Sequence, residues 1–360
     1  MDNSAKFEKR DFVSGLFLSC TVQSTGWITV RAVGIIGLMT SKMLRILAAN
    51  RLHFGLLAFG GNREQRYGGA GMMIEQPGIE VRISQATRLT IVGVLGDRVR
   101  NVVRRWSDWS QVSPDPPCRI EVLSSPRMHV GLGVGTQLGL AIARGLNTFF
   151  NRPAAELPEL AQSVGRGARS AVGALGFECG GLIAEQGKSA SETLSKLQCR
   201  IELPGEWRAV LLCEPGEGLH GARETGAFAE LPPIPAETTR QLALEMTQRM
   251  LPAAAAGQFD EFSESVYQYG HTSGRCFARI QGGAYNGKRA AHLTEAIRQL
   301  GFRGAGQSSW GPTVYALTAD QAAAEHLVEQ LRNAGNLEST EVIISPPNNS
   351  GARFEWMEDG

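Results

Sequence analysis

The chain has 360 residues, a formal net charge of +1 and six cysteines. This length exceeds one ordinary hydrophobic core and predicts two closely joined domains. The near-neutral charge argues against a nucleic-acid partner. The cysteines contain no C-x-x-C pair, so they indicate neither a zinc site nor a disulfide framework, and we expect free thiols in a cytoplasmic protein.

The first 42 residues are unusual for a globular domain. The apolar run Phe12–Ser19 is short, and the second run, Trp27–Met39, contains Arg31 and is shorter than the roughly 20 residues that span a bilayer. We therefore expect no membrane partner. We expect residues 1–42 to be disordered, or to be an extension upstream of a misassigned start, with the first natural strand beginning at Met43.

Residues 45–119 are expected to contain strands and one helix. Alternating apolar residues predict the strands, and they carry His53 and the turn residue Asn62, each of which is either a substrate contact or a structural residue. The stretch Arg98–Trp109 mixes arginines with tryptophans. Because the overall charge is near neutral, we interpret it as a solvated helix with inward tryptophans, in preference to a nucleic-acid face.

The most informative stretch runs from Arg119 to Phe150. It reads as a strand, a loop with Gly131, Gly133 and Gly135, and a helix with Thr136 near its N-cap. Glycines before a helix N-terminus form a seat for a phosphate or diphosphate, although a simple tight turn is the alternative. No lysine follows the last glycine and the third glycine of a dinucleotide fingerprint is missing, so two common nucleotide loops are excluded.

The segment from Pro126 to Gln137 resembles the phosphate-loop motif Pro-x-x-x-Gly-Leu-Gly-Ser-Ser-Ala of the GHMP kinase superfamily. Val134 and Gly135 stand where those kinases carry serines, one of which helps to hold the magnesium of MgATP. Within the superfamily, the reading His-Val-Gly-Leu-Gly-x-Gly-Thr-Gln is similar to the β-ribofuranosylaminobenzene 5'-phosphate synthase family.

The resemblance implies an α+β, two-domain GHMP-kinase-like fold. Its N-terminal domain, ribosomal-protein-S5-like and α/β, would occupy residues 43–230 and contain the phosphate loop. A ferredoxin-like α+β domain would follow at residues 231–346, with a tail at residues 347–360. The stiff Leu-Pro-Pro-Ile-Pro segment, which starts at Leu231, marks the boundary.

Two later segments continue the resemblance. The run Gly165–Leu182 carries Arg166 and Arg169, whose guanidinium groups suit a phosphate or a carboxylate but would also suit a surface loop. Glu178 follows in an apolar stretch that we expect to be a strand, where it would need either an arginine partner or a magnesium ion. The run Gly304–Leu317 is similar to the synthases' Gly-Gln-Ser-Ser-Trp-Gly-Pro turn, whose backbone would face the ligand.

These motifs supply the candidate site residues. His129 would orient a phosphate, move a proton or serve the structure alone. The catalytic candidates are His129, Arg166, Arg169 and Glu178, with Glu178 also the candidate metal ligand. The substrate-binding or phosphate-binding candidates are Arg127, Gly131, Gly133, Gly135, Thr136, Gln137, His53, His220, Arg223, Gln307, Ser308 and Ser309.

The resemblance also implies a function. The substrates would be phosphoribosyl diphosphate and 4-aminobenzoate, condensed with loss of CO2 and diphosphate in methanopterin biosynthesis, with Mg2+ as cofactor and a homodimer as the assembly. An ATP-dependent small-molecule kinase of the same superfamily is the alternative enzyme, although the loop serines are missing. A noncatalytic ligand-binding protein with the same fold is the third hypothesis.

Overall fold

The computed structural model describes residues 18–22, 28–32, 42–60 and 66–358. The chain separates into two units, Met1–Ser41 and Lys42–Gly360. In the first unit, β1 (Leu18–Val22) and β2 (Ile28–Ala32) pair antiparallel. The prediction about residues 1–42 otherwise falls outside the described residues, as does Asn62, and it stays a prediction.

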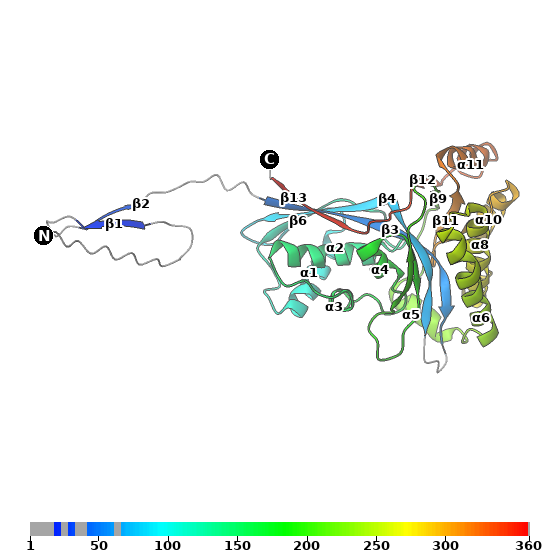
Figure 1. The fold of residues 1–360 in the computed structure, drawn as a ribbon, viewed down its shortest axis with the longest axis horizontal. Helices are drawn as coiled ribbons and strands as arrows, with labels where there is room; N and C mark the ends of the chain where they lie inside the picture. The colour runs from blue at the N-terminus through cyan, green and yellow to red at the C-terminus, as the bar shows by residue number, and fades with distance from the viewer. Residues whose placement is uncertain (1–17, 23–27, 33–41, 61–65, 359–360) are drawn as a thin grey trace. The chain divides into compact units, whose positions relative to one another are not determined.

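The larger sheet of the second unit contains two long strands that cross the molecule (Figure 1). The strand order is β13, β3, β4, β6, β5, while β7 pairs with β4 and β8 pairs with β7. All pairs are antiparallel except β5 with β6. The strands are β3 (Lys42–Ala58), β4 (Tyr67–Gln85), β5 (Thr90–Gly93), β6 (Cys118–Ser124), β7 (Leu182–Glu185), β8 (Leu197–Ile201) and β13 (Arg353–Glu358).

Four helices cover one face of this sheet (Figure 1): α1 (Gly96–Ser110), α2 (Val134–Phe149), α3 (Leu157–Ser163) and α4 (Val172–Cys179). Leu138, Ile142 and Leu146 of α2 are fully buried at helical spacing, as the sequence predicts. A Cβ atom on Gly145 would lie 2.4 Å from Ile46 Cδ1 of β3, so glycine allows α2 to pack closely on the sheet.

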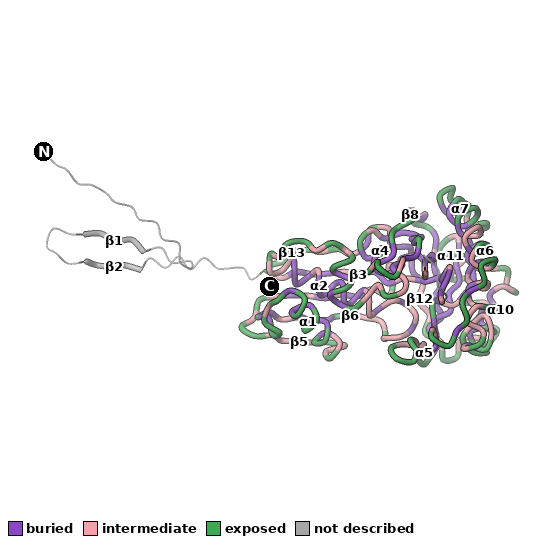
Figure 2. The backbone as a smooth tube through the Cα atoms, turned by 90° about the horizontal axis from the view of Figure 1, so that it is seen from below, coloured by how far each residue is buried: buried purple, intermediate pink, exposed green. Residues whose placement is uncertain are grey.

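The smaller sheet has the order β10, β11, β9, β12, with every pair antiparallel. Its strands are β9 (Arg208–Cys213), β10 (Ala305–Gln307), β11 (Thr313–Thr318) and β12 (Glu341–Ser345). The helices of this part are α5 (Gly221–Glu230), α6 (Ala236–Leu244), the π-helical turn η1 (Glu245–Met250), α7 (Leu251–Ala255), α8 (Phe259–Arg275), α9 (Ala278–Gln281), α10 (Lys288–Gln299) and α11 (Gln321–Asn333). In Figure 2, buried backbone follows much of β3 and α2, whereas α5 is largely exposed.

Strand pairing joins segments from both sides of the predicted domain boundary between residues 230 and 231. Strand β9 precedes that boundary, yet it pairs with β11 and β12, which follow it. Strand β13 lies in the predicted tail, yet it pairs with β3 of the larger sheet. The sheets therefore do not divide the chain at these positions, because strand pairing brings together segments that are distant in sequence.

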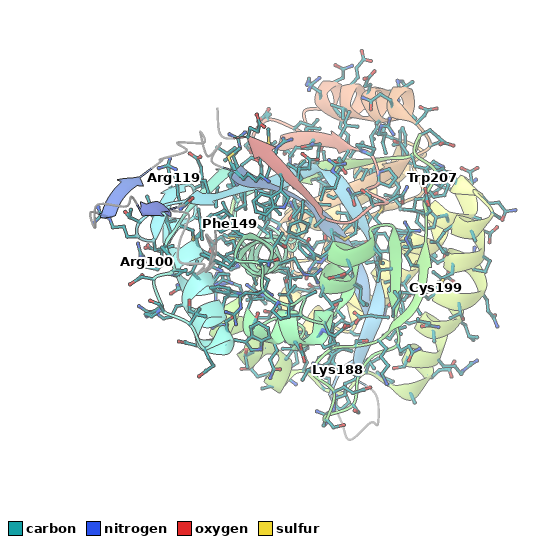
Figure 3. The ribbon with its side chains drawn as sticks, turned by 60° about the vertical axis from the view of Figure 1, so that its left-hand side comes forward. Arg100, Arg119, Phe149, Lys188, Cys199 and Trp207 are labelled. Carbon is teal, nitrogen blue, oxygen red and sulfur yellow. The ribbon has the colours of Figure 1, made fainter. Side chains whose placement is uncertain are left out.

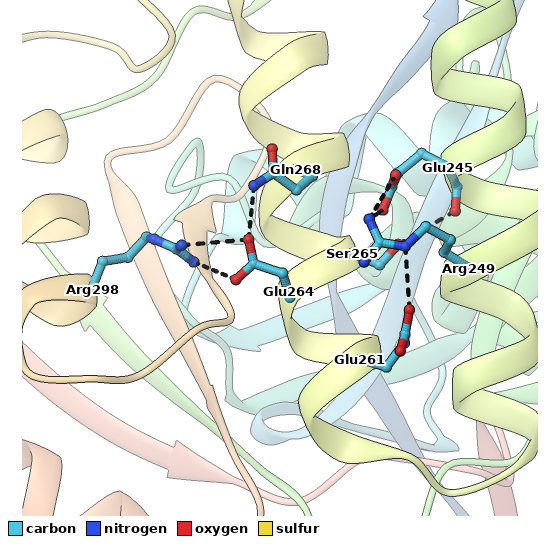
Figure 4. Close-up of polar contacts among 7 residues, drawn as sticks. All are labelled: Glu245, Arg249, Glu261, Glu264, Ser265, Gln268 and Arg298. Atoms are coloured by element: carbon cyan, nitrogen blue, oxygen red, sulfur yellow. Dashed lines mark hydrogen bonds and ion pairs between the residues drawn. The ribbon is translucent and has the colours of Figure 1, made fainter.

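Side-chain contacts tie the helices to the sheets. Trp207, which Figure 3 labels, precedes β9 and stacks on Phe262 of α8 with ring centroids 5.0 Å apart. On the same helix, Glu264 accepts hydrogen bonds from Arg298 of α10 at 3.0 Å and from Gln268 at 2.7 Å (Figure 4). These contacts hold α8, which also lines the cavity described below.

Two sequence-based expectations about local structure are wrong. Helix α2 begins at Val134, with Gly133 at its N-cap, so Thr136 lies inside its first turn. Glu178 lies in helix α4 and not in a strand, because the helix buries Ala174 and Phe177 on one face and ends only at Gly180.

Within the described ranges, none of the helices is long and apolar enough to cross a bilayer.

Candidate active site

A cavity of about 640 Å³ lies beside the glycine loop. It is lined by parts of β3 and α1, the loop that leads into α2, the loop before α4, α5 with the residues just before it, the stretch from the end of α8 to Tyr285, and the turn between β10 and β11. Of the predicted site residues, it is lined by His53, His129, Gly131, Gly133, Gly135, Thr136, Arg166, Arg169, His220, Gln307 and Ser309. The fold therefore brings predicted residues from five separate stretches of the sequence together at one cavity.

The glycine loop has the geometry of an anion seat. Gly131 has φ 90° and Gly133 has φ 77°, a region that favours glycine. A Cβ atom on Gly131 would lie 2.3 Å from the carbonyl oxygen of Ser308, so no larger residue fits there. Helix α2 starts directly after Gly133. In its first turn the Thr136 N–H donates to the Gly133 carbonyl at 2.9 Å, whereas the N–H groups of Val134 and Gly135 have no hydrogen-bond partner among the described residues. These N–H groups and the helix dipole favour a phosphate or diphosphate at this point.

Three arginines gather beside this loop. Arg98 and Arg105 come from α1, and Arg166 comes from the loop before α4. Burial, together with the charges of Arg98 and Arg105, lowers the pKa of Arg166 to about 10. A Cβ atom on Gly135 would lie 2.6 Å from Nη2 of Arg166, which places this guanidinium against the first turn of α2.

No carboxylate among the described residues forms an ion pair with Arg98, Arg105 or Arg166. Arg105 donates one hydrogen bond to the Val164 carbonyl at 3.3 Å. Neighbouring guanidinium groups repel one another, and an anion with several oxygens would relieve that repulsion. The cluster is thus suited to a diphosphate.

A fourth arginine, Arg51 of β3, is hydrogen-bonded to the glycine loop. Its side chain donates a hydrogen bond to the Gly131 carbonyl, and its backbone N–H donates to the Leu132 carbonyl at 3.0 Å. Burial lowers the pKa of Arg51 to about 10, against the opposing charges of Glu224 and Glu185. Arg51 therefore remains charged at neutral pH and adds positive potential beneath the anion seat.

Arg169 is placed differently from Arg166. Its guanidinium forms an ion pair with Glu224 at 2.8 Å and lies over the ring of Phe228, 4.7 Å from the centroid. Its charge is therefore partly neutralised by the protein. Arg169 lines the cavity, but Arg166 is the better anion ligand.

Two histidines stack at the cavity wall. The rings of His129 and His220 have centroids 3.5 Å apart and an interplanar angle of 14°. His220 Nε2 lies 3.2 Å from a carboxylate oxygen of Glu217, and the His129 carbonyl accepts a hydrogen bond from Gly218 at 2.8 Å. Burial, followed by the charge of His220, lowers the pKa of His129. His129 is therefore neutral at pH 7.

Aromatic rings form another part of the lining. Trp310 meets Phe277 edge to face with centroids 4.9 Å apart, and it meets Phe228 in the same way at 5.8 Å. Tyr285 also lines the cavity, and its buried hydroxyl has no hydrogen-bond partner among the described residues. The cavity thus combines an arginine cluster with an aromatic cluster, which suits a ligand that carries both an anion and a flat ring.

The remaining predicted residues do not line the cavity, although Ser308 and Gln137 support its walls. The buried Ser308 accepts a hydrogen bond from the His53 backbone N–H at 3.0 Å and donates to the Gly131 carbonyl at 2.7 Å. Gln137 is buried and donates to the Gly173 carbonyl at 2.6 Å. Arg127 and Arg223 are exposed, and Arg127 donates to the Glu214 carbonyl at 3.3 Å.

Comparisons with known proteins agree with this arrangement. The family described as GHMP kinases C terminal matches residues 250–337. The chain is 29% identical to the beta-ribofuranosylphenol 5'-phosphate synthase of Archaeoglobus fulgidus over 297 residues, which cover 78% of this chain and 89% of the relative. It is 24% identical to the Methanocaldococcus jannaschii protein of the same name over 337 residues, which cover 86% of this chain and 99% of the relative. Over most of its length the chain is thus similar to these synthases, and its residues 250–337 match the GHMP kinases C-terminal family.

A solved structure shows the same fold. Phosphomevalonate kinase of Streptococcus pneumoniae superposes with a TM-score of 0.62 at 11% identity, covering 85% of this chain and 99% of that one. At this identity the similarity shows the fold alone. The α+β, GHMP-kinase-like fold predicted from the sequence is confirmed.

The predicted metal ligand does not lie at the cavity. Glu178, the predicted metal ligand, forms an ion pair with Arg144 and does not line the cavity. Glu224 is the only carboxylate residue in the described lining, and it is paired with Arg169. Across the described residues there is no group of three or more His, Cys, Asp or Glu that could hold a metal ion.

The most important residues that sequence reasoning missed are Arg51, Arg98 and Arg105. Arg98 and Arg105 are seven residues apart, which places them on one face of α1. This spacing is a signal that the sequence contains, but it does not show which element the face meets. The predicted inward tryptophans are half right, because Trp106 is buried whereas Trp109 is 39% exposed.

Proposed function

We propose that this protein joins phosphoribosyl diphosphate to 4-aminobenzoate and releases diphosphate and CO2. The observation that carries the proposal is the arginine cluster without carboxylate partners, placed against the glycine loop in a cavity that also holds aromatic rings. The synthase family supports it, since the relatives' name describes a ribofuranosylphenol 5'-phosphate. We also propose that the product serves methanopterin biosynthesis.

The anion seat would carry the chemistry of the sugar donor. The bond between C1 of the ribose and the diphosphate oxygen breaks, and its electron pair leaves with the diphosphate. Arg98, Arg105 and Arg166, with the first-turn N–H groups of α2, would stabilise the charge that develops on the leaving group. The ribose carbon is left as an electron-poor, oxocarbenium-like centre.

The arene would then attack through the ring carbon that bears the carboxylate. The para amino group donates electron density into the ring, which makes this carbon nucleophilic. A carbon–carbon bond forms to the ribose, the bond to the carboxylate breaks, its electron pair returns to the ring, and CO2 leaves. No nucleophilic side chain is needed, so positioning and charge stabilisation would supply most of the rate.

Magnesium would enter this reaction with the substrate. Mg2+ is commonly bound through substrate phosphates and water, with few protein ligands. We therefore propose that it arrives as the counterion of the diphosphate. The protein's own contribution would be the guanidinium and backbone donors.

The test is the release of labelled CO2 from carboxyl-labelled substrate in the presence of phosphoribosyl diphosphate and Mg2+. We expect release in step with diphosphate formation, and 4-hydroxybenzoate should be assayed in parallel because the relatives' name describes a phenol. ADP formation from ATP with no CO2 release would favour the kinase hypothesis. Binding of phosphoribosyl diphosphate without turnover of either benzoate would favour a noncatalytic protein.

A further inference from the structure

A buried serine hydroxyl connects a buried carboxylate to a histidine of the cavity. Ser170 Oγ lies 2.6 Å from Oε1 of Glu185 and 2.9 Å from Nε2 of His53. Glu185 is fully buried at the end of β7, and His53 of β3 is 5% exposed. The proposed reaction uses none of these three residues, although His53 and Ser170 line the cavity.

The hydrogen-bond donors of this chain are fixed by its chemistry. The Ala171 N–H donates to Oε2 of Glu185 at 2.8 Å, and the Val172 N–H donates to Ser170 Oγ at 3.2 Å. An ionised carboxylate can only accept, so the single hydroxyl proton of Ser170 points to Glu185. The Nε2 atom of His53 must then be the donor to Ser170 Oγ.

Ionised Glu185 is consistent with its surroundings. Burial raises its pKa, but the hydrogen bonds from Ser170 and Ala171 oppose that effect. The cations Arg51 and Lys188 interact favourably with it. Lys188, labelled in Figure 3, is itself held by the carbonyl of Gly167 at 2.6 Å.

This arrangement leaves His53 neutral, with its proton on Nε2 and a free electron pair on Nδ1. Burial and the charge of Arg51 lower the pKa of His53 to about 3, so the ring does not become a cation at neutral pH. No described residue forms a hydrogen bond with Nδ1. His53, which lines the cavity, thus offers an uncharged acceptor near several cationic donors.

The position of His53 indicates what this acceptor would meet. Along β3 it stands between Arg51, which contacts the glycine loop, and Leu56, which packs in the cluster that contains Trp310. A lone pair repels phosphate and carboxylate oxygens, so its natural partner is a hydroxyl group. In a sugar diphosphate attacked by an arene, the pentose is the part between the anion and the ring.

We propose that His53 Nδ1 accepts a hydrogen bond from a hydroxyl of the bound pentose, with Ser170 and Glu185 as positioning residues that fix its tautomer. This inference rests on the proposed function, which supplies the pentose. The residue at position 185 then determines whether Nδ1 of His53 is a hydrogen-bond acceptor or a donor.

The substitution Glu185→Gln tests this directly. Because the Ala171 N–H requires an oxygen, the glutamine amide would place its NH2 group toward Ser170. Ser170 would then donate its proton to Nε2 of His53, and the ring proton would move to Nδ1. The carboxylate-to-amide change is nearly isosteric, and Glu178→Gln, on a carboxylate outside the cavity, is the matched control.

The readout is ¹⁵N NMR of the full chain with labelled histidine, using His53→Gln to assign one signal among six histidines. We expect the Nε2–H tautomer in the wild type and in Glu178→Gln, and the Nδ1–H tautomer in Glu185→Gln. Unlabelled ribose 5-phosphate should shift the wild-type Nδ1 signal. In Glu185→Gln, kcat/KM for phosphoribosyl diphosphate should fall by about tenfold or more, with KM for 4-aminobenzoate unchanged.

An Nδ1–H tautomer of His53 in the wild type would overturn the inference. An Nε2–H tautomer that persists in Glu185→Gln would also overturn it. The inference is also overturned if ribose 5-phosphate shifts the signals of other histidines, which shows that it binds, but leaves the ¹⁵N signal of His53 Nδ1 unchanged. If Glu185→Gln does not fold, Ser170→Ala must abolish the single Nε2–H tautomer, or the inference is wrong. The NMR measurement of the His53 tautomer does not depend on turnover. Absence of CO2 release from the wild type would therefore count against the proposed function alone.

Discussion

Replacing Arg166 with methionine should stabilise the fold and weaken diphosphate binding. Burial and the neighbouring Arg98 and Arg105 lower the pKa of Arg166 from its usual value to about 10. At about 1.4 kcal/mol per tenfold change, this corresponds to an upper limit of about 3 kcal/mol of unfavourable free energy in the ligand-free protein. Since the guanidinium is partly exposed and solvent screens its charge, the expected gain in stability is about 1 kcal/mol.

The same substitution removes a charge-assisted contact to the anion. Such a contact is worth about 1.5–3 kcal/mol, so the Kd for phosphoribosyl diphosphate should rise by about 10-fold to 100-fold. The stability is measured by reversible denaturant unfolding without ligand, and the affinity by isothermal titration calorimetry. The two changes have opposite signs, which general damage to the fold would not produce.

Arg240→Met is the matched control. Arg240 pairs with Glu237 at 2.7 Å on the exposed face of α6, away from the cavity, so neither quantity should change. The reasoning is refuted if Arg166→Met lowers stability, or if it binds phosphoribosyl diphosphate as tightly as the wild type.

Three further outcomes test other parts of the account. Gly131→Ala should lower the free energy of unfolding by about 3 kcal/mol, because φ is 90° and the new Cβ would meet the Ser308 carbonyl; an unchanged urea midpoint would contradict this. Glu178→Gln should leave activity and its magnesium dependence unchanged in CO2-release assays, since Glu178 pairs with Arg144 outside the cavity; a shifted magnesium requirement would show otherwise. The lowered pKa of His129 should rise when a diphosphate offsets the nearby arginines, so binding takes up a proton and strengthens as pH falls between the bound and free pKa values. Calorimetry in buffers of different ionisation enthalpy measures this proton uptake. The variant His129→Gln should lose the part of the uptake that belongs to His129, and what remains comes from the ligand's own protons.

The loop and helix from residue 131 to residue 149 were predictable because their signals are local. Gly131 and Gly133 require unusual backbone angles, and the apolar spacing of α2 appears directly in the sequence. Even there the N-cap was placed three residues late, since Gly133 begins the helix without a side-chain cap. Glu178 was misplaced because a short apolar stretch that precedes two glycines does not distinguish a strand from a helix.

The arginine cluster could not be derived from the sequence alone. Arg98 and Arg105 lie more than 60 residues before Arg166, and only the packing of α1 beside α2 brings them to one wall of the cavity. Arg51 similarly depends on the pairing of β3 and on its crossing beneath the loop. Sequence reasoning thus found the glycine loop and Arg166, and it missed the three arginines that the tertiary structure brings beside them.

The central claim is that the arginine cluster and the glycine loop together hold the diphosphate of the sugar donor. A crystal structure of the protein with magnesium phosphoribosyl diphosphate tests it most directly. The account predicts the diphosphate against the first turn of α2, within hydrogen-bond distance of Arg166 and at least one of Arg98 and Arg105. A donor bound elsewhere, with these guanidinium groups free of it, would contradict the account.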